Sequence, residues 1–178
     1  MLNKIAFIGG IHGVGKSTIC RKICEKIELE YLSASNLLKW NDINNDAQNK
    51  KVKNIPATQD RLIIGLANTI KKNKSYLLDG HYCLLNSANE IVKIPLDTFK
   101  KINPISLNLI LGNISEIKNR LEKRDSIQYD EELLNRMQKN ELKYAKYLSK
   151  AMGVTLNIGT QNEFAALLTS LHKTFSNL

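Results

Sequence analysis

Short apolar runs alternate with amphipathic stretches along the chain, which predicts a mostly parallel sheet with helices on both faces. Lys4–Ile8, Ser75–Asp79 and Ile105–Leu111 are predicted core strands. The near-continuous apolar character of the third suits a strand buried on both sides. Glu30–Leu32 and Gly153–Ile158 complete the set of five predicted strands.

Apolar residues that recur every three or four positions predict the helices. Ile19, Ile23 and Ile27 share one face of a helix predicted over Gly15–Ile27. Further helices are predicted over Ser33–Trp40, Thr58–Lys72, Ser115–Arg124, Glu131–Met152 and Glu163–Thr174. Asn41–Asn54 is instead rich in Asn, Asp and Lys. A long polar insertion of this kind is either a functional flap or a passive surface loop.

The length and composition fit one globular domain. The chain has 178 residues, of which 43% are hydrophobic and 24% charged, which excludes wholesale disorder and a membrane bundle. No apolar run is long enough to cross a bilayer. Three cysteines in a chain of this length form no disulfide framework. We therefore expect a cytoplasmic protein with reduced thiols.

The net charge of +9 favours anionic partners, such as nucleotides or RNA. A basic surface of this kind is also compatible with a protein partner. A skewed composition would give the same lysine excess, because only five of the 26 basic residues are arginine. The charge alone leaves these alternatives open.

The strongest motif is Gly10-Ile11-His12-Gly13-Val14-Gly15-Lys16-Ser17, which Thr18 follows. It fits the phosphate-loop pattern, with the required strand before it and helix after it. Backbone N–H groups of such a loop surround phosphates, the lysine reaches the β- and γ-phosphates, and the serine hydroxyl binds Mg²⁺. We expect ATP here, held by Gly10, His12, Gly13, Val14, Gly15, Lys16, Ser17 and Thr18.

Two further features suit phosphoryl chemistry. Asp79 ends an apolar strand, where a carboxylate can help organise magnesium beside a phosphate loop, and His81 follows it. Arg120 and Arg124 lie one helical turn apart, so their guanidinium groups could stabilise a transferring phosphoryl group. Each feature also has a structural alternative. Asp79 could be an ordinary turn residue, His81 could have a structural role, and the two arginines could lie on a solvated helix face.

The order of these motifs resembles the adenylate kinase superfamily over nearly the whole chain. Within it, Asp79-Gly80-His81 is similar to the Asp-x-His motif of a compact group, which includes archaeal-type adenylate kinases and nuclear adenylate-kinase-like ATPases. The resemblance implies a three-layer phosphate-loop fold with a five-stranded parallel sheet in the order 2-3-1-4-5. It also implies an acceptor and flap region over residues 31–60 and a short lid region over 120–136, without the zinc set of long-lid kinases.

The same resemblance suggests further site residues. Ser33, Asn36 and Lys39 match the stretch that opens the nucleoside monophosphate site, although Asn36 and Lys39 replace that family's acid and arginine. Asp60-Arg61 resembles the Asp-Arg step that begins the next helix of the compact group, so Arg61 joins them as a candidate for the acceptor pocket. Asn157 and Gly159 lie where the superfamily holds the adenine, so they join Arg120 as cofactor-binding candidates. Gln138-Lys139-Asn140-Glu141 resembles the Gln-x-x-Glu helix that follows a short lid.

We therefore expect ATP–Mg²⁺-dependent phosphoryl transfer to a small acceptor, in the first place a nucleoside monophosphate. Lys16, Asp79, His81, Arg120 and Arg124 are the expected catalytic residues, and Ser17 and Asp79 are the expected magnesium ligands. One alternative is an ATPase switch that acts on a protein or RNA partner. The other is a kinase for a non-nucleotide metabolite.

Overall fold

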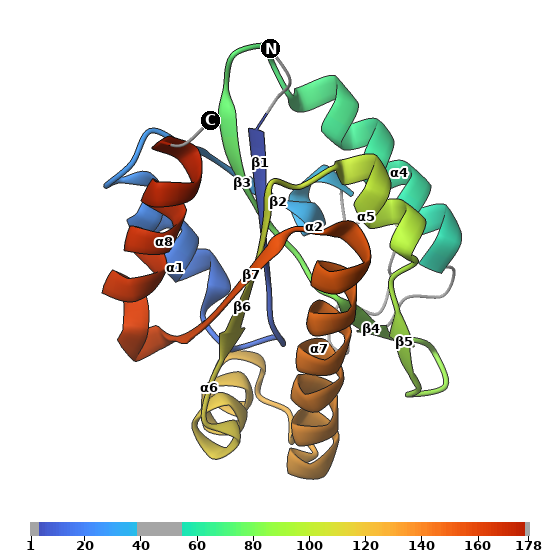
Figure 1. Ribbon diagram of the computed structural model, residues 1–178. Coiled ribbons are helices and arrows are strands. Elements are labelled where there is room, and N and C mark those ends of the chain that lie inside the picture. The colour runs from blue at the N-terminus through green and yellow to red at the C-terminus, as the bar shows by residue number, and fades with distance from the viewer. Residues whose placement is uncertain (1–3, 39–54, 177–178) are drawn as a thin grey trace.

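The computed structural model describes residues 4–38 and 55–176, and a five-stranded parallel sheet forms its centre (Figure 1). The strands are β1 (Lys4–Gly9), β2 (Glu30–Ser33), β3 (Ser75–Asp79), β6 (Ser106–Leu111) and β7 (Thr155–Thr160). They lie in the order β2-β3-β1-β6-β7, all parallel. Counted within this sheet alone, that is the expected order 2-3-1-4-5.

Strand β1 shows why the sheet is covered on both faces. Its side chains alternate between two hydrophobic clusters, with Ile5 and Phe7 in one and Ala6 and Ile8 in the other. All four are at most 3% exposed. Successive side chains of a strand point to opposite faces, so an unbroken apolar run requires a helix layer on each side.

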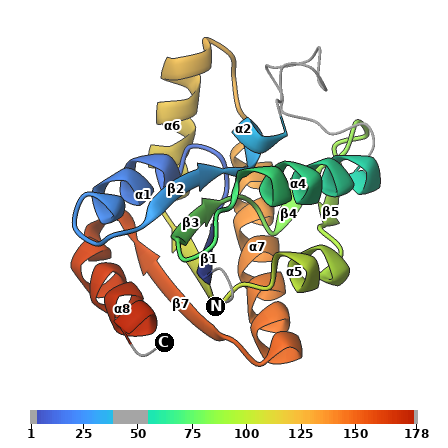
Figure 2. The ribbon, with the colours of Figure 1, turned by 90° about the horizontal axis from the view of Figure 1, so that it is seen from above.

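The helices form these two layers (Figures 1 and 2). Helices α1 (Lys16–Cys24), α6 (Ile114–Asp125) and α8 (Phe164–Ser176) supply apolar residues to one cluster. Helices α4 (Ile55–Thr69) and α5 (Leu96–Ile102) supply the other, together with the second half of α7 (Glu131–Met152). Figure 2 shows α1 and α8 on the opposite side of the sheet from α4, α5 and α7.

Residues 83–102 form elements that the sequence pattern did not predict. They are the antiparallel hairpin of β4 (Cys83–Leu85) and β5 (Ile91–Lys93), followed by α5. Each strand of the hairpin is only three residues long, so it carries little periodicity. This segment packs between α7 and α4 and becomes part of the site described below.

Several predicted boundaries were also wrong. Helix α1 ends at Cys24 instead of Ile27, and the described part of α2 is the single turn Ala34–Leu37. The last strand runs from Thr155 to Thr160 instead of ending at Ile158. Residues 126–130 form the short connection that was predicted between α6, which carries Arg120 and Arg124, and α7. Asp130 caps α7, because its side chain accepts hydrogen bonds from two backbone N–H groups.

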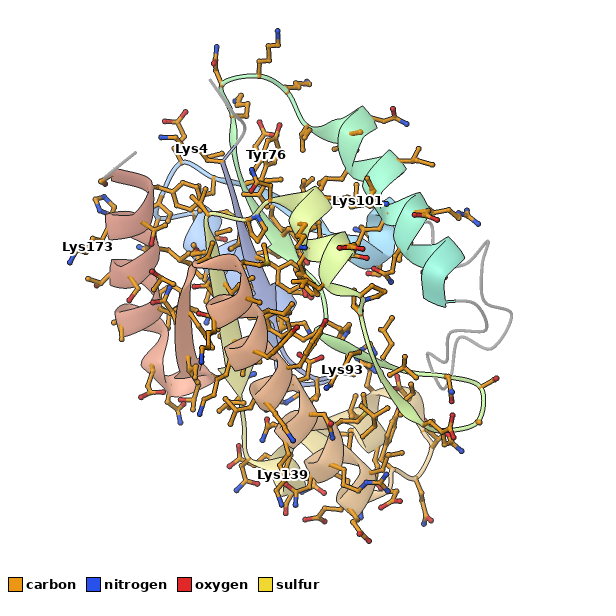
Figure 3. The ribbon with its side chains drawn as sticks, turned by 45° about the vertical axis from the view of Figure 1, so that its right-hand side comes forward. Lys4, Tyr76, Lys93, Lys101, Lys139 and Lys173 are labelled. Carbon is orange, nitrogen blue, oxygen red and sulfur yellow. The ribbon has the colours of Figure 1, made fainter. Side chains whose placement is uncertain are left out.

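None of the described helices is long and apolar enough to cross a membrane. The labelled lysines in Figure 3 lie on five different elements, β1, β5, α5, α7 and α8, and do not gather at one place.

Candidate phosphoryl-transfer site

The phosphate loop connects β1 to α1 and carries the motif glycines in conformations that other residues avoid. Gly13 and Gly15 have φ angles of +76° and +93°. At Gly13 an added Cβ would also lie 2.7 Å from Leu121. The Lys16 side chain is 7% exposed, and its ammonium donates to the carbonyls of Gly10 at 2.8 Å and Ile11 at 3.2 Å. The lysine thus lies over the loop, where a phosphate would meet it.

Asp79 lies at the carboxyl end of β3, beside the loop. Its Oδ2 accepts hydrogen bonds from the Ser17 hydroxyl and the Tyr31 hydroxyl, each at 3.0 Å. The serine and the aspartate predicted to organise magnesium are therefore in direct contact. Burial raises the pKa of Tyr31 to about 12, so its hydroxyl remains a donor at neutral pH. Tyr31 was not among the residues predicted for the site.

His81 follows Asp79 by two residues and lies next to the loop. Its ring centroid is 4.2 Å from that of His12, and its Nδ1 is 3.9 Å from Oε1 of Glu141. Glu141 is fully buried, and the same oxygen accepts the backbone N–H groups of Tyr82 and Cys83 at 2.8 Å each. Glu141 thus ties α7 to the turn that follows β3.

The buried carboxyl of Glu141 has an altered acidity. Burial raises its pKa to about 7, although the backbone amide of Cys83 and the ammonium of Lys16 oppose the shift. A group that titrates near neutral pH is therefore placed behind the phosphate loop.

The two predicted arginines differ in their contacts. Arg120 donates to the carbonyl of Gly13 at 2.6 Å and to Oε1 of Gln161 at 3.5 Å, and Gln161 donates to the carbonyl of Val14. Arg124 instead donates twice to Asp125, each at 2.6 Å. The structure brings Arg120 to the phosphate loop and leaves Arg124 paired with its neighbour at the end of α6.

A cavity of about 680 Å³ opens beside the loop. One end is polar and is lined by His12, Lys16, Ser17, Asp79 and His81. The rest of the wall is mostly apolar and includes Leu62, Leu84, Ile94, Phe99 and Ile102, with Ser33, Asn36, Gln59 and Thr98 among its polar members. Lys16 is the one lysine or arginine among the described residues that line it.

The predicted acceptor residues are only partly brought to this cavity. Ser33 and Asn36 line it, from the end of β2 and from α2. Arg61 is exposed on α4 and is not on the described cavity wall. Lys39 and the predicted flap Asn41–Asn54 lie outside the described residues.

The predicted adenine-binding residues lie inside a strand and not in a loop. Asn157 and Gly159 belong to β7, where Asn157 donates to Oδ1 of Asn108 at 2.9 Å. Gln161, the first residue after β7, contacts the phosphate loop by donating to the carbonyl of Val14.

Three residues of the site were missed as candidates, namely Tyr31, Glu141 and Gln161. The Gln-x-x-Glu resemblance had marked Glu141 without giving it a role. Gln138 of that motif both donates to and accepts from the backbone of Gly112, at 3.0 and 2.9 Å. Nothing in the local sequence signals Tyr31 or Gln161, because their partners are 48 and 147 residues away.

Comparison with known proteins agrees with this architecture. The family model of the AAA domain matches residues 9–138, which include the phosphate loop, Asp79 and Arg120. The chain belongs to this AAA domain family. The match supports membership in the broader class of phosphate-loop proteins. It does not confirm the closer resemblance to archaeal-type adenylate kinases. No curated protein sequence matches the chain significantly.

Solved structures share the fold of this AAA domain protein. A gluconokinase from Sinorhizobium meliloti 1021 aligns with a TM-score of 0.61 at 11% sequence identity, over 98% of this chain and 92% of its own. An unliganded sugar kinase from Janibacter sp. HTCC2649 aligns with a TM-score of 0.60 at 15% identity, over 98% and 95%. Identities this low establish the fold only.

Proposed function

We propose that the protein transfers the γ-phosphoryl group of ATP to a hydroxyl group of a small, non-nucleotide acceptor. The observation that carries the proposal is the cavity beside Lys16, Ser17 and Asp79, because it offers room for a second substrate at the end of the phosphate loop. An enzyme that only hydrolyses ATP needs no such room.

The residues at the polar end suit ATP and magnesium. The Ser17 hydroxyl and the Asp79 carboxylate present the hard oxygen ligands that Mg²⁺ prefers, and they lie together at the start of α1. Bound there, the ion would neutralise charge on the β- and γ-phosphates. Lys16 would exchange its contacts with the Gly10 and Ile11 carbonyls for phosphate oxygens, and Arg120 would add charge from α6.

The described part of the cavity wall favours an acceptor without a phosphate group. A nucleoside monophosphate brings a second phosphate, which needs its own cationic partners away from the ATP. Lys16 is assigned to the ATP, and the described wall offers no further lysine or arginine. The names gluconokinase and sugar kinase of the two solved structures support a non-nucleotide acceptor over the nucleotide acceptor that the sequence suggested first.

A nucleoside monophosphate remains the second candidate, because the apolar wall around Leu62, Phe99 and Ile102 could hold a base. A direct assay separates the two. Purified protein is incubated with ATP–Mg²⁺ and, one at a time, neutral hexoses, polyols, sugar acids, nucleosides and nucleoside monophosphates, and phosphorylated products are identified by mass spectrometry.

We expect a phosphorylated, non-nucleotide hydroxyl compound as the product. Conversion of AMP or another monophosphate into its diphosphate would instead establish the nucleotide kinase. Slow release of inorganic phosphate that no acceptor changes would favour the ATPase switch.

A further inference from the structure

One buried polar group on the cavity wall has no partner in the described structure. Gln59 of α4 is 4% exposed, and its side chain lines the cavity. No residue among 4–38 and 55–176 donates a hydrogen bond to its Oε1. Native proteins satisfy nearly all buried acceptors, so an unsatisfied one that faces a cavity calls for a specific explanation.

The surroundings of Gln59 point to a ligand. Leu62 follows it by one helical turn, and Phe99 and Ile102 come from α5 on the same wall. These apolar side chains offer no donor of their own, and the Thr98 hydroxyl on this wall is not bonded to Oε1. A molecule with an apolar face and a hydroxyl or N–H group would satisfy Oε1 while covering the apolar wall.

We infer that Gln59 determines acceptor specificity by accepting a hydrogen bond from a second donor group of the acceptor. This inference rests on the proposed function. It defines the acceptor as a compound with one hydroxyl at the Asp79 end, an apolar face, and another hydroxyl or N–H at the Gln59 end. Gln59 acts in binding and takes no part in the transfer itself.

The chain offers a matched control in Gln138 of α7. Both polar atoms of its amide are bonded to the backbone of Gly112, so this glutamine is satisfied inside the protein. Gln59→Leu and Gln138→Leu therefore make the same chemical change at an unsatisfied and at a satisfied amide.

The first measurement is thermal unfolding without any ligand. Gln138→Leu should lower Tm by roughly 4 to 8 °C, because it leaves the N–H and carbonyl of Gly112 without partners. Gln59→Leu should keep Tm or raise it by up to about 4 °C, because it removes a buried group that has no partner. If Gln59→Leu lowered Tm as much as Gln138→Leu does, Gln59 would be a structural residue and the inference would be overturned.

The second measurement is ligand binding by thermal shift, with neutral hexoses, polyols and nucleosides as probes. At least one probe should stabilise the wild type, and Gln59→Leu should weaken its binding about tenfold while Gln138→Leu leaves it unchanged. For a probe that is also phosphorylated, the change should fall on KM, with kcat within about twofold.

Deoxy analogues of that probe complete the test. The analogue that lacks the second hydroxyl should bind the wild type about tenfold more weakly and should bind Gln59→Leu as well as the parent compound does. The inference would be overturned if the wild type and Gln59→Leu discriminated equally between the probe and its deoxy analogue. It would also be overturned if no probe stabilised the wild type. A probe that binds through Gln59 without being phosphorylated would confirm Gln59 as a ligand-binding residue and would count against the proposed kinase activity.

Discussion

The two halves of the site differ in how their polar groups are satisfied. The phosphate half comprises residues 9–18 with Asp79, Arg120 and Gln161, and its polar groups bond to one another. The acceptor half comprises the cavity wall from α2, α4 and α5, together with Leu84 and Ile94. It is largely apolar and contains Gln59, whose Oε1 has no partner among the residues that the structure describes.

This difference indicates a different kind of specificity in each half. A preformed polar cradle fits one chemical group, phosphate, whatever molecule carries it. An apolar wall with few polar atoms instead selects by shape and by the position of individual donors. Changes in the phosphate half should therefore act on the transfer step, and changes in the acceptor half on acceptor affinity.

The largest effect is expected at Lys16. Lys16→Ala removes the ammonium group that would stabilise charge on the transferring phosphoryl group, so kcat/KM for transfer should fall by about 10³-fold or more. Circular dichroism and thermal unfolding should show an intact fold. Binding of neutral acceptors by thermal shift should persist, and its loss would mean that the two halves are not separate.

Asp79→Asn tests the boundary between the halves. An asparagine can still accept the hydrogen bonds of Ser17 and Tyr31, but it lacks the charge that would help hold magnesium. Transfer and acceptor-independent hydrolysis should both fall by roughly 10²-fold, because both need the metal. An unchanged dependence on magnesium concentration would contradict this placement of the metal.

Glu141→Gln tests the support that both halves share. The pKa of Glu141 is about 7 in the folded protein, against an ordinary value of 4.5, because burial disfavours the charged form. The folded state therefore binds more protons than the unfolded state between these values, and stability should fall as the pH rises from about 4.5 to about 7.

The amide introduced by Glu141→Gln keeps an oxygen for the backbone N–H groups of Tyr82 and Cys83 but does not titrate. The variant should therefore lack this pH dependence. The free energy of unfolding of the variant should therefore increasingly exceed that of the wild type across that window, by on the order of 3 kcal/mol above pH 7. Chemical denaturation at pH 4.5, 6 and 8 measures it, and parallel pH profiles for both proteins would refute the altered acidity of Glu141.

The smallest effect is expected at Tyr31. Tyr31→Phe removes one of the two hydrogen bonds to Asp79 and leaves the ring in place. The half-saturating magnesium concentration for transfer should rise about threefold to tenfold, with the acceptor KM unchanged. A shift in acceptor KM alone would instead assign Tyr31 to the acceptor half.

The phosphate half could be predicted because its motif reflects local requirements. Glycines with positive φ, a lysine and a serine have to follow a strand directly, so Gly10–Ser17 is recognisable from sequence, as is the apolar strand that ends in Asp79. The sheet order came from the resemblance, since no pattern along one strand reveals which strand lies beside it.

The acceptor half could not be predicted to the same degree. The strands of the β4–β5 hairpin are too short to show a period, and α5 covers only Leu96–Ile102. Arg61 was predicted from the family resemblance, yet it lies on the exposed side of α4, while Gln59 two residues earlier lines the cavity. Which side of a helix meets a cavity depends on its neighbours in space.

The central position of β1 has a consequence for biosynthesis. β1 pairs with β3 on one side, through Lys4 and Ser75, and with β6 on the other, through Ala6 and Ser106. A ribosome that adds roughly 5 to 20 residues per second needs about 5 to 20 s to make the chain from Ala6 to Ser106. During that time an apolar strand has an unpaired edge, which is the form of nascent chain that chaperones bind and that aggregates when it is overproduced.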